Sequence, residues 1–220
     1  MDKTKFSKMS KLIEELLSSP VTTYGLAKAL RDVQKELVFF NNYIKSQKNK
    51  SEEYFLKGDN LKLQIGGGQH VVDGYVNLDI VPPADVIWDV REGIPLENRS
   101  ANFIFSEHFL EHLDYPVSVK KFIKECYRVL KKGGQIVIGV PDGKLAIESY
   151  VKKDKDYWDK ALARWYKNRE ELEHFNTYMD LLNYVFRDQY DDSNYSPHYW
   201  AYDFEKLTSL LEGFGFRRVE

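Results

Sequence analysis

The sequence predicts an α/β fold built on a mostly parallel sheet, with a helical hairpin before the sheet and a helical cap inserted after it. Three observations indicate this fold. Short β-rich apolar runs alternate with glycines in the centre of the chain, one amphipathic helix separates the last two runs, and the segments outside the centre carry helical spacing. A strand, a helix and a strand in that order imply parallel pairing with a right-handed crossover.

The first segment, residues 1–56, is predicted to form a helical hairpin and a linker. From Thr22 to about Ser46, apolar residues recur at spacings of four and three, and a shorter amphipathic helix precedes them. The polar stretch from Lys45 to Glu53 has the composition of a linker. We expect the hairpin to pack onto the chain's own main domain, and a dimeric coiled coil is the alternative.

The second segment, residues 57–142, carries the predicted sheet. Its apolar runs occupy residues 61–65, 75–80, 84–88, 102–106 and 135–140. Between the last two runs, an apolar stripe from Val119 to Leu130 predicts a helix that Gly133 and Gly134 terminate. Each run is short enough for a buried strand of a parallel sheet.

Two further segments follow the predicted sheet. Residues 143–200 are rich in aromatic and charged side chains without period-two alternation, so we expect a helical cap beyond the carboxyl end of the sheet, where open α/β sheets bind ligands. Residues 201–220 are predicted to form a helix N-capped by Asp203, and then the start of a strand at residues 216–220.

Composition excludes several classes of protein. The 220 residues are 43% hydrophobic and 30% charged, which is typical of a folded globular chain, and the net charge of −2 gives no field for binding nucleic acid or an anionic membrane. No apolar run is long enough for a membrane helix and the N-terminus does not resemble a secretory signal, so we expect no membrane insertion and a cytoplasmic location. Cys126 is the single cysteine, which excludes an internal disulfide or a zinc cage of cysteines.

A glycine loop and an acid at the ends of neighbouring strands predict a nucleoside site. Gly66, Gly67 and Gly68 follow the first run, and Asp79 closes the second, where a carboxylate can accept hydrogen bonds from both hydroxyls of a ribose. A dinucleotide is disfavoured, because Val71 stands where a third glycine is needed and Asp79 follows Gly66 by only 13 residues. S-adenosylmethionine is a nucleoside ligand without phosphates.

These stretches resemble the class I S-adenosylmethionine-dependent methyltransferases, and within them a small branch often associated with sugar or glycan modification. The matching stretches are LQIGGGQHVVDGYVNLDI, VIWDVREGIPLENRSANFIFSEHFLEHL, KECYRVLKKGGQIVIGVPD and, more weakly, HYWAYDFEKLTSLLEGFGF. The resemblance implies a Rossmann-like class I methyltransferase sheet and S-adenosylmethionine as cofactor, with S-adenosylhomocysteine as product. It also implies the cofactor-binding residues: Gly66, Gly67, Gly68, Asp79, Ile80, Trp88, Asp89, Val90 and Ser106.

The sequence departs from the family pattern at several places, among them a helix after the glycine loop that is too short to be regular. Gln64 replaces an acid two residues before the first glycine, which leaves the cofactor's ammonium group without that carboxylate, and Asn102 stands where the fourth strand commonly begins with Asp. The family's last two strands are represented only by residues 216–220, so the C-terminal strands look incomplete. We favour truncation, with an edge covered by helices, the cap or a second subunit as the alternative.

The segment Ser106 to His112 carries the candidate catalytic groups. His108 is the first candidate for a general base and Glu107 the second, and the alternative is that His108 binds substrate or caps the following helix. We expect His112 to be a packed structural residue. The i, i+4 pair His108 and His112 with Glu111 could suggest a metal site, but we expect no metal, because the order H-F-L-E-H does not match the zinc-protease spacing and no third ligand is evident.

The predicted function is transfer of a methyl group from S-adenosylmethionine to oxygen or nitrogen of a small polar acceptor, such as a sugar or glycan precursor. The substrate-binding candidates are Asp142, His198, Tyr199 and Trp200. The alternative is a non-catalytic S-adenosylmethionine-binding or scaffolding module, and an NAD-dependent oxidoreductase is disfavoured by the glycine pattern. A homodimer through the N-terminal helix or an exposed sheet edge stays open beside the small-molecule acceptor as a partner.

Overall fold

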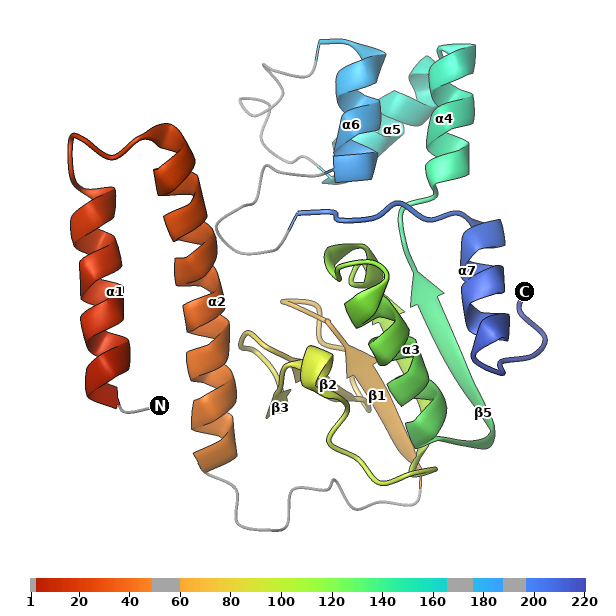
Figure 1. The fold of residues 1–220 in the computed structure, drawn as a ribbon. Helices are drawn as coiled ribbons and strands as arrows, with labels where there is room; N and C mark the ends of the chain where they lie inside the picture. The colour runs from red at the N-terminus through yellow and green to blue at the C-terminus, as the bar shows by residue number, and fades with distance from the viewer. Residues whose placement is uncertain (1–2, 49–59, 166–175, 188–196) are drawn as a thin grey trace.

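The protein is built around one parallel sheet. A computed structural model describes residues 3–48, 60–165, 176–187 and 197–220. The sheet has five strands in the order β3-β2-β1-β4-β5, and every neighbouring pair is parallel (Figure 1). The strands are β1 Leu61–Ile65, β2 Val76–Asp79, β3 Val86–Ile87, β4 Ala101–Glu107 and β5 Leu130–Gly139. The predicted α/β fold with a Rossmann-like parallel sheet is therefore confirmed.

Helix α3, Val117–Val129, packs its apolar stripe against the sheet. Its stripe is fully buried in the main core: Val119, Phe122, Ile123, Cys126 and Val129. Burial raises the pKa of the Cys126 thiol well above its ordinary value, so this side chain serves as a small apolar residue of the core.

The end of α3 differs from the prediction. The helix ends at Val129, and β5 begins at once with Leu130, which pairs with Ala101. Gly133 and Gly134 therefore lie inside β5, and the prediction that they terminate the helix is wrong. The β4–β5 register shifts between Ala101 and Phe103, so the glycines lie in an irregularity of the ladder, where Gly133 adopts a positive φ of 82°.

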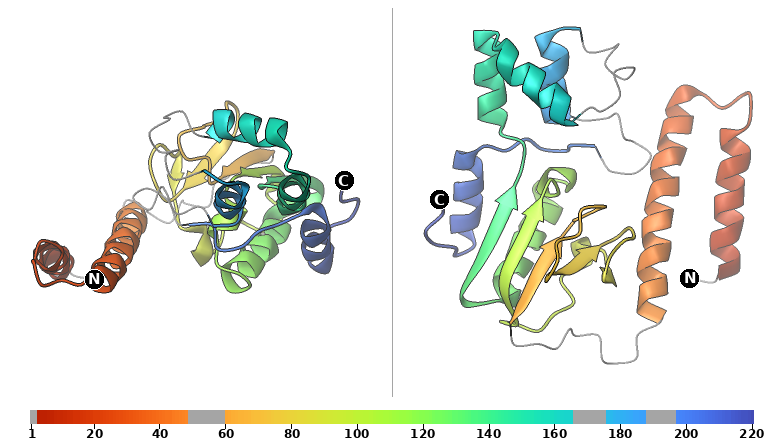
Figure 2. Two further views of the ribbon diagram at one scale, coloured as in Figure 1. Left: turned by 90° about the horizontal axis from the view of Figure 1, so that it is seen from above. Right: turned by 180° about the vertical axis from the view of Figure 1, so that it is seen from behind.

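The N-terminal hairpin lies beside the β3 edge of the sheet (Figures 1 and 2). It consists of α1, Lys3–Leu17, and α2, Tyr24–Lys48. Asn42 donates a hydrogen bond from Nδ2 to the backbone oxygen of Ile80 at 3.1 Å, and the Tyr43 ring meets Trp88 edge to face at 5.1 Å. The hairpin therefore packs onto the chain's own main domain, as expected.

The hairpin also differs in detail from the sequence analysis. Three residues of the predicted apolar stripe, Leu26, Val33 and Phe40, are 41–46% exposed, and the α2 side chains that contact the main domain include Asn42 and Tyr43, which lie outside that stripe. Helix α2 continues to Lys48, so the first part of the expected linker is helical, and the rest of that linker lies outside the described residues.

The expected cap is a small helical cluster above the carboxyl ends of the strands (Figure 1). It contains α4 Gly143–Lys152, α5 Lys155–Trp165 and α6 Tyr178–Arg187. A second core of Ala146, Trp158, Leu181 and Val185 holds these helices together. Residues 166–175 and 188–196, which belong to the predicted cap, lie outside the described residues.

After the cap, residues 197–203 cross back over the sheet to α7, Phe204–Gly213, which lies beside β5 (Figure 2). As predicted, Asp203 caps α7 by accepting a hydrogen bond from the Lys206 N–H at 2.7 Å.

The predicted strand at residues 216–220 does not form. Phe214, Phe216 and Val219 pack against the main core, and Arg218 adopts a left-handed φ of 58°, which interrupts an extended run. In the part of the chain that the structure describes, no strand pairs with the outer edge of β5.

Candidate functional site

A cleft opens at the carboxyl ends of β1, β2 and β4. It encloses about 770 Å³, open mouth included, which is the size of a small-molecule site. Most of the predicted cofactor residues line it: Gly66, Gly68, Asp79, Ile80, Trp88, Asp89 and Val90. Two predicted residues do not line it, because Gly67 lies over the side chains of Gln64 and Asn77 and Ser106 is 1% exposed within the sheet.

The glycine loop after β1 packs closely against neighbouring side chains. At Gly66, with φ of 71°, an added Cβ would lie 2.2 Å from the Phe109 ring. At Gly67, it would lie 2.6 Å from the side chain of Gln64, so both positions require glycine. Gln64 is 3% exposed, donates from Nε2 to the His70 carbonyl, and accepts the Val72 N–H at Oε1 over 2.8 Å. Gln64 therefore orders the loop from beneath.

Asp79 joins the end of β2 to this loop. Its Oδ2 accepts the Gly68 N–H at 2.9 Å, and its Oδ1 accepts the Val81 N–H at 2.9 Å. A carboxylate oxygen has two lone pairs, so each oxygen keeps one acceptor position for a ligand hydroxyl in the cleft. The predicted position of Asp79, beside the glycine loop at the end of the neighbouring strand, is what the structure shows.

Asp89 forms an ion pair with Arg91, which is not among the site residues predicted from the sequence. Asp89 caps the short 3₁₀ helix η1, Val90–Glu92, by accepting the Arg91 N–H at 2.9 Å. The Arg91 guanidinium pairs with Asp89 Oδ2 at 2.8 Å and also with both carboxylate oxygens of Glu36 on α2. The hydrogen bonds that Arg91 donates to Glu36 and Asp89 raise the pKa of Arg91 above its ordinary value.

His108 stands at the cleft, and Glu107 does not line it. His108 has a left-handed φ of 51°, and its backbone N–H donates to the Gly139 carbonyl at 2.9 Å. Its Nδ1 lies 3.3 Å from Oε1 of Glu111, and this hydrogen bond raises the pKa of His108 above its ordinary value. Among the described residues, the cleft lining includes His108 and omits Glu107. The geometry thus separates the two candidate bases.

The other predicted residues divide between two places. His112 is half-buried and lines the cleft, and its ring meets that of His198 edge to face, with centroids 4.8 Å apart. Trp200 stacks on Tyr115 at 4.5 Å and lines a separate pocket between α4 and α7. Asp142 caps α4 by accepting the Leu145 N–H at 3.1 Å. Of the four substrate candidates, His198 is the one whose ring contacts a described residue of the cleft lining, His112.

Several residues that line the cleft were not predicted from the sequence, and three of them have aromatic or charged side chains. Phe39 comes from α2, Arg91 from η1, and Phe109 follows β4. Arg91 follows the predicted Asp89 by two positions, so an arginine beside a candidate ligand carboxylate was a usable signal. For Phe39, on a helix predicted only to pack somewhere on the main domain, the sequence carries no such signal.

Comparisons with known proteins match one family model to a segment that carries part of this site. Residues 78–138 match the model of a methyltransferase domain. A search of the curated proteins gave no significant match. Two similar solved structures are a Thermotoga maritima protein described as an S-adenosylmethionine-dependent methyltransferase and possible histamine N-methyltransferase, and a Methanococcus maripaludis protein assigned to the same class. The first is 16% identical over 85% of this chain and 77% of that chain, with a TM-score of 0.44. The second is 18% identical over 79% and 90%, with a TM-score of 0.31.

The domain match and the parallel sheet show that the chain carries a methyltransferase domain, for which S-adenosylmethionine is the implied cofactor. The matched segment runs from Leu78 on β2 to Ile138 on β5, so it contains Asp79, Asp89 and His108 of the cleft. No helix in the described parts of the chain is long and apolar enough to cross a membrane.

Proposed function

We propose that this methyltransferase transfers the methyl group to an oxygen or nitrogen atom of a small polar acceptor, such as a sugar or glycan precursor. The observation that carries the proposal is that Asp79 and His108, at the ends of β2 and β4, line one cleft. A carboxylate able to hold a ribose and an imidazole able to accept a proton then face the same space. Open α/β sheets bind their ligands at this end.

The residues of the cleft fit the cofactor. Asp79 offers an acceptor position on each oxygen to the ribose hydroxyls, and the apolar surfaces of Ile80, Trp88 and Phe39 suit the adenine ring. Asp89 shares its carboxylate with Arg91, so its role is to place that guanidinium at the cleft wall. When bound, S-adenosylmethionine supplies a methyl group on a positively charged sulfur.

His108 acts as the general base in this proposal. Its backbone is held by Gly139, and its Nδ1 by Glu111, which leaves Nε2 to accept a proton from the acceptor's hydroxyl or ammonium group. Glu111 is a positioning residue, because it orients the ring through Nδ1. Holding the acceptor close and aligned supplies the rest of the acceleration.

The cap is proposed to select the acceptor. It stands over the carboxyl ends of the strands (Figure 1), and His198, in the segment that returns from the cap, meets the ring of His112 in the cleft lining. Aromatic surfaces suit the apolar faces of sugar rings. This placement supports a small ring-shaped polar acceptor.

The test is methyl transfer from radiolabelled S-adenosylmethionine to a panel of sugars, sugar nucleotides and small amines. We expect His108→Ala to lower kcat by about 100-fold, the contribution of a positioned general base, with the Kd for S-adenosylhomocysteine unchanged. Glu107→Ala is the matched control and should keep full turnover. A His108→Ala variant that raises only the KM for the acceptor would make His108 a binding residue, and unchanged kinetics would exclude it from the site.

A further inference from the structure

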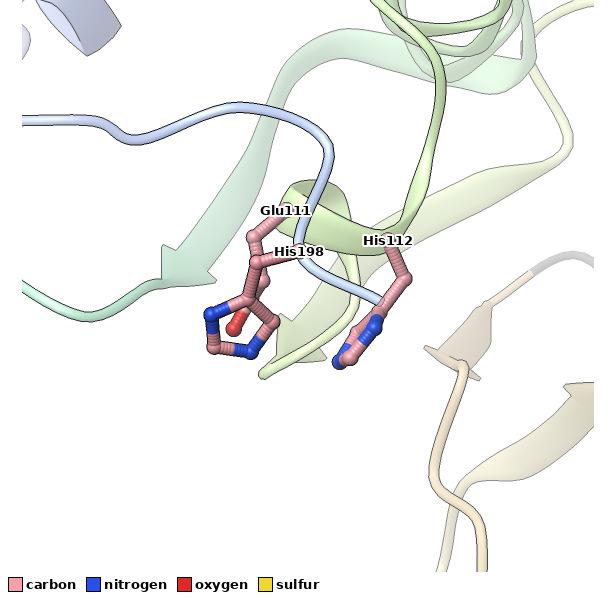
Figure 3. Close-up of side chains that lie close together, drawn as sticks. All are labelled: Glu111, His112 and His198. Carbon is pink, nitrogen blue, oxygen red and sulfur yellow. The ribbon is translucent and has the colours of Figure 1, made fainter. Parts of the chain in front are cut away.

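Three side chains with metal-ligand chemistry lie close together (Figure 3), and one of them, His112, lines the cleft. Glu111 and His112 project from the short 3₁₀ helix η2, Leu110–His112, and His198 projects from the segment that returns from the cap. One ligand atom of each residue lies within 4.8 Å of those of the other two. No metal is expected from the sequence, where no third ligand is evident beside the histidine pair and Glu111, and the fold supplies His198.

The backbone fixes this meeting. The Tyr199 N–H donates to the Glu111 carbonyl at 2.8 Å, so the returning segment is attached to η2 at the residue after His198. The rings of His112 and His198 then meet edge to face with an interplanar angle of 71°. The three side chains are thus held together by main-chain geometry as well as by their own packing.

Glu111 carries a buried acceptor that needs a donor or a cation. The residue is 2% exposed, and its Oε1 faces Nδ1 of His108. Its Oε2 has no hydrogen-bond partner among the described residues. A buried polar atom without a partner costs free energy, and a bound ion is one way in which a native protein satisfies such an atom.

His198 is oriented as a metal ligand. Its Nδ1 lies 3.0 Å from the carbonyl oxygen of Val185 on α6. A carbonyl oxygen can only accept, so Nδ1 carries the proton and the lone pair lies on Nε2. Metal-binding histidines in proteins characteristically donate their other ring nitrogen to a carbonyl or carboxylate in this way, which fixes both tautomer and ring orientation.

From this geometry we propose that Glu111, His112 and His198 bind a divalent transition-metal ion of the zinc type. Two imidazoles and one carboxylate suit such an ion, whereas Mg²⁺ and Ca²⁺ prefer oxygen ligands. Bond lengths of about 2.0–2.2 Å place two ligand atoms of a tetrahedral site about 3.3 Å apart, so the side chains draw together on binding by small rotations. Three protein ligands leave at least one coordination position open.

The open position gives the site a role in the methyltransferase. His112 lines the cleft and so does His108, so an ion on this cluster lies at the wall of the same space. A hydroxyl or carboxylate oxygen of the acceptor that takes the open position is held in place, and a hydroxyl bound there becomes more acidic. This role rests on the proposed function, whereas metal binding itself does not.

The test is metal binding to tag-free protein that has been stripped with chelator, in the absence of cofactor and acceptor. Calorimetry with Zn²⁺ should give one ion per chain, and Co²⁺ should give the visible absorption of a four- or five-coordinate site. His112→Ala and His198→Ala should each weaken Zn²⁺ binding by about 100-fold or more, since even partners outside the coordination shell contribute 10- to 100-fold. Glu111→Gln, a neutral isostere, should also weaken it. His70→Ala, at an exposed histidine of the glycine loop, is the matched control and should bind as the parent does.

Two results would overturn the inference. One is a stripped parent protein that binds neither Zn²⁺ nor Co²⁺, and the other is binding that persists unchanged in both His112→Ala and His198→Ala. Melting curves identify any variant that loses metal binding because it unfolds. Zn²⁺ binding by whichever of Glu111→Gln and His198→Ala stays folded then decides whether the cluster binds the ion. Metal binding without methyl transfer would count against the proposed function alone, and full methyl transfer in chelator with no metal binding would count against the metal site alone.

Discussion

Replacement of Asp79 tests the link between the glycine loop and the cofactor. In the structure, the carboxylate accepts one backbone N–H at each oxygen, from Gly68 and Val81, both at 2.9 Å. Asp79→Ala removes both acceptors, whereas Asp79→Asn keeps one oxygen and turns an amide NH₂ toward the other N–H. The alanine variant should therefore be the more severe of the two.

The magnitude follows from the number of charged hydrogen bonds. A hydrogen bond to a charged group contributes about 1.5–3 kcal/mol, and the proposed ribose contact is of this kind. Loss of that contact in Asp79→Ala should weaken S-adenosylhomocysteine binding by about 10- to 150-fold, at about 1.4 kcal/mol per factor of ten. Loss of the two backbone contacts should also loosen the loop around Gly68, and Asp79→Asn should show roughly half of each effect.

The assay is calorimetric titration with S-adenosylhomocysteine, together with thermal melting to confirm folding. Asp73→Ala, which removes an exposed carboxylate from the same loop, is the control and should bind as the parent does. A folded Asp79→Ala protein with the parent's Kd would refute the assignment of Asp79 to the ribose.

Three other perturbations address packing and electrostatics. Gly66→Ala should destabilise the fold by about 1–3 kcal/mol through overpacking. In contrast, Gly74→Ala, at a φ of 80° with no atom within 4 Å, should show only the backbone penalty, so equal melting temperatures would remove the steric argument. Glu36→Gln breaks the ion pair that joins α2 to Arg91 and, since both side chains are partly exposed, should cost less than about 1 kcal/mol in denaturant unfolding. A larger loss would mean that the hairpin depends on this pair. The hydrogen bond that Arg128 donates lowers the pKa of Glu125 in the folded protein. The ionised Glu125 carboxylate therefore stabilises the fold above the ordinary pKa of a carboxyl group, and this stabilisation is lost as the pH falls through the lowered pKa of the folded protein. Glu125→Gln should reduce the fall in the free energy of unfolding at acidic pH, and an unchanged fall would contradict this role of Glu125.

Short sequence patterns predicted the strands of the sheet and the part of the cleft formed by Asp79 and the glycine loop. Strands β1, β2 and β4 lie where short apolar runs are found, because a strand buried in a parallel sheet is short and rich in apolar residues. Asp79 and the glycine loop lie side by side because the ends of neighbouring parallel strands meet at one edge of the sheet. The same reasoning was wrong at Gly133 and Gly134, where glycine relieves an irregularity in a ladder instead of ending a helix.

The sequence by itself determined the fold class, the glycine loop after β1 and the position of His108 after β4, since each depends on neighbours along the chain or on the parallel-strand rule. Only the tertiary structure decided that Phe39 of the hairpin lines the cleft and that His198 meets Glu111 and His112. These residues are far apart in the chain. The packing of α2 beside the sheet edge brings Phe39 to the cleft, and the hydrogen bond from the Tyr199 N–H to the Glu111 carbonyl brings His198 to Glu111 and His112. Such contacts leave no periodic pattern in the sequence, because the path of a returning segment is determined by what it packs against.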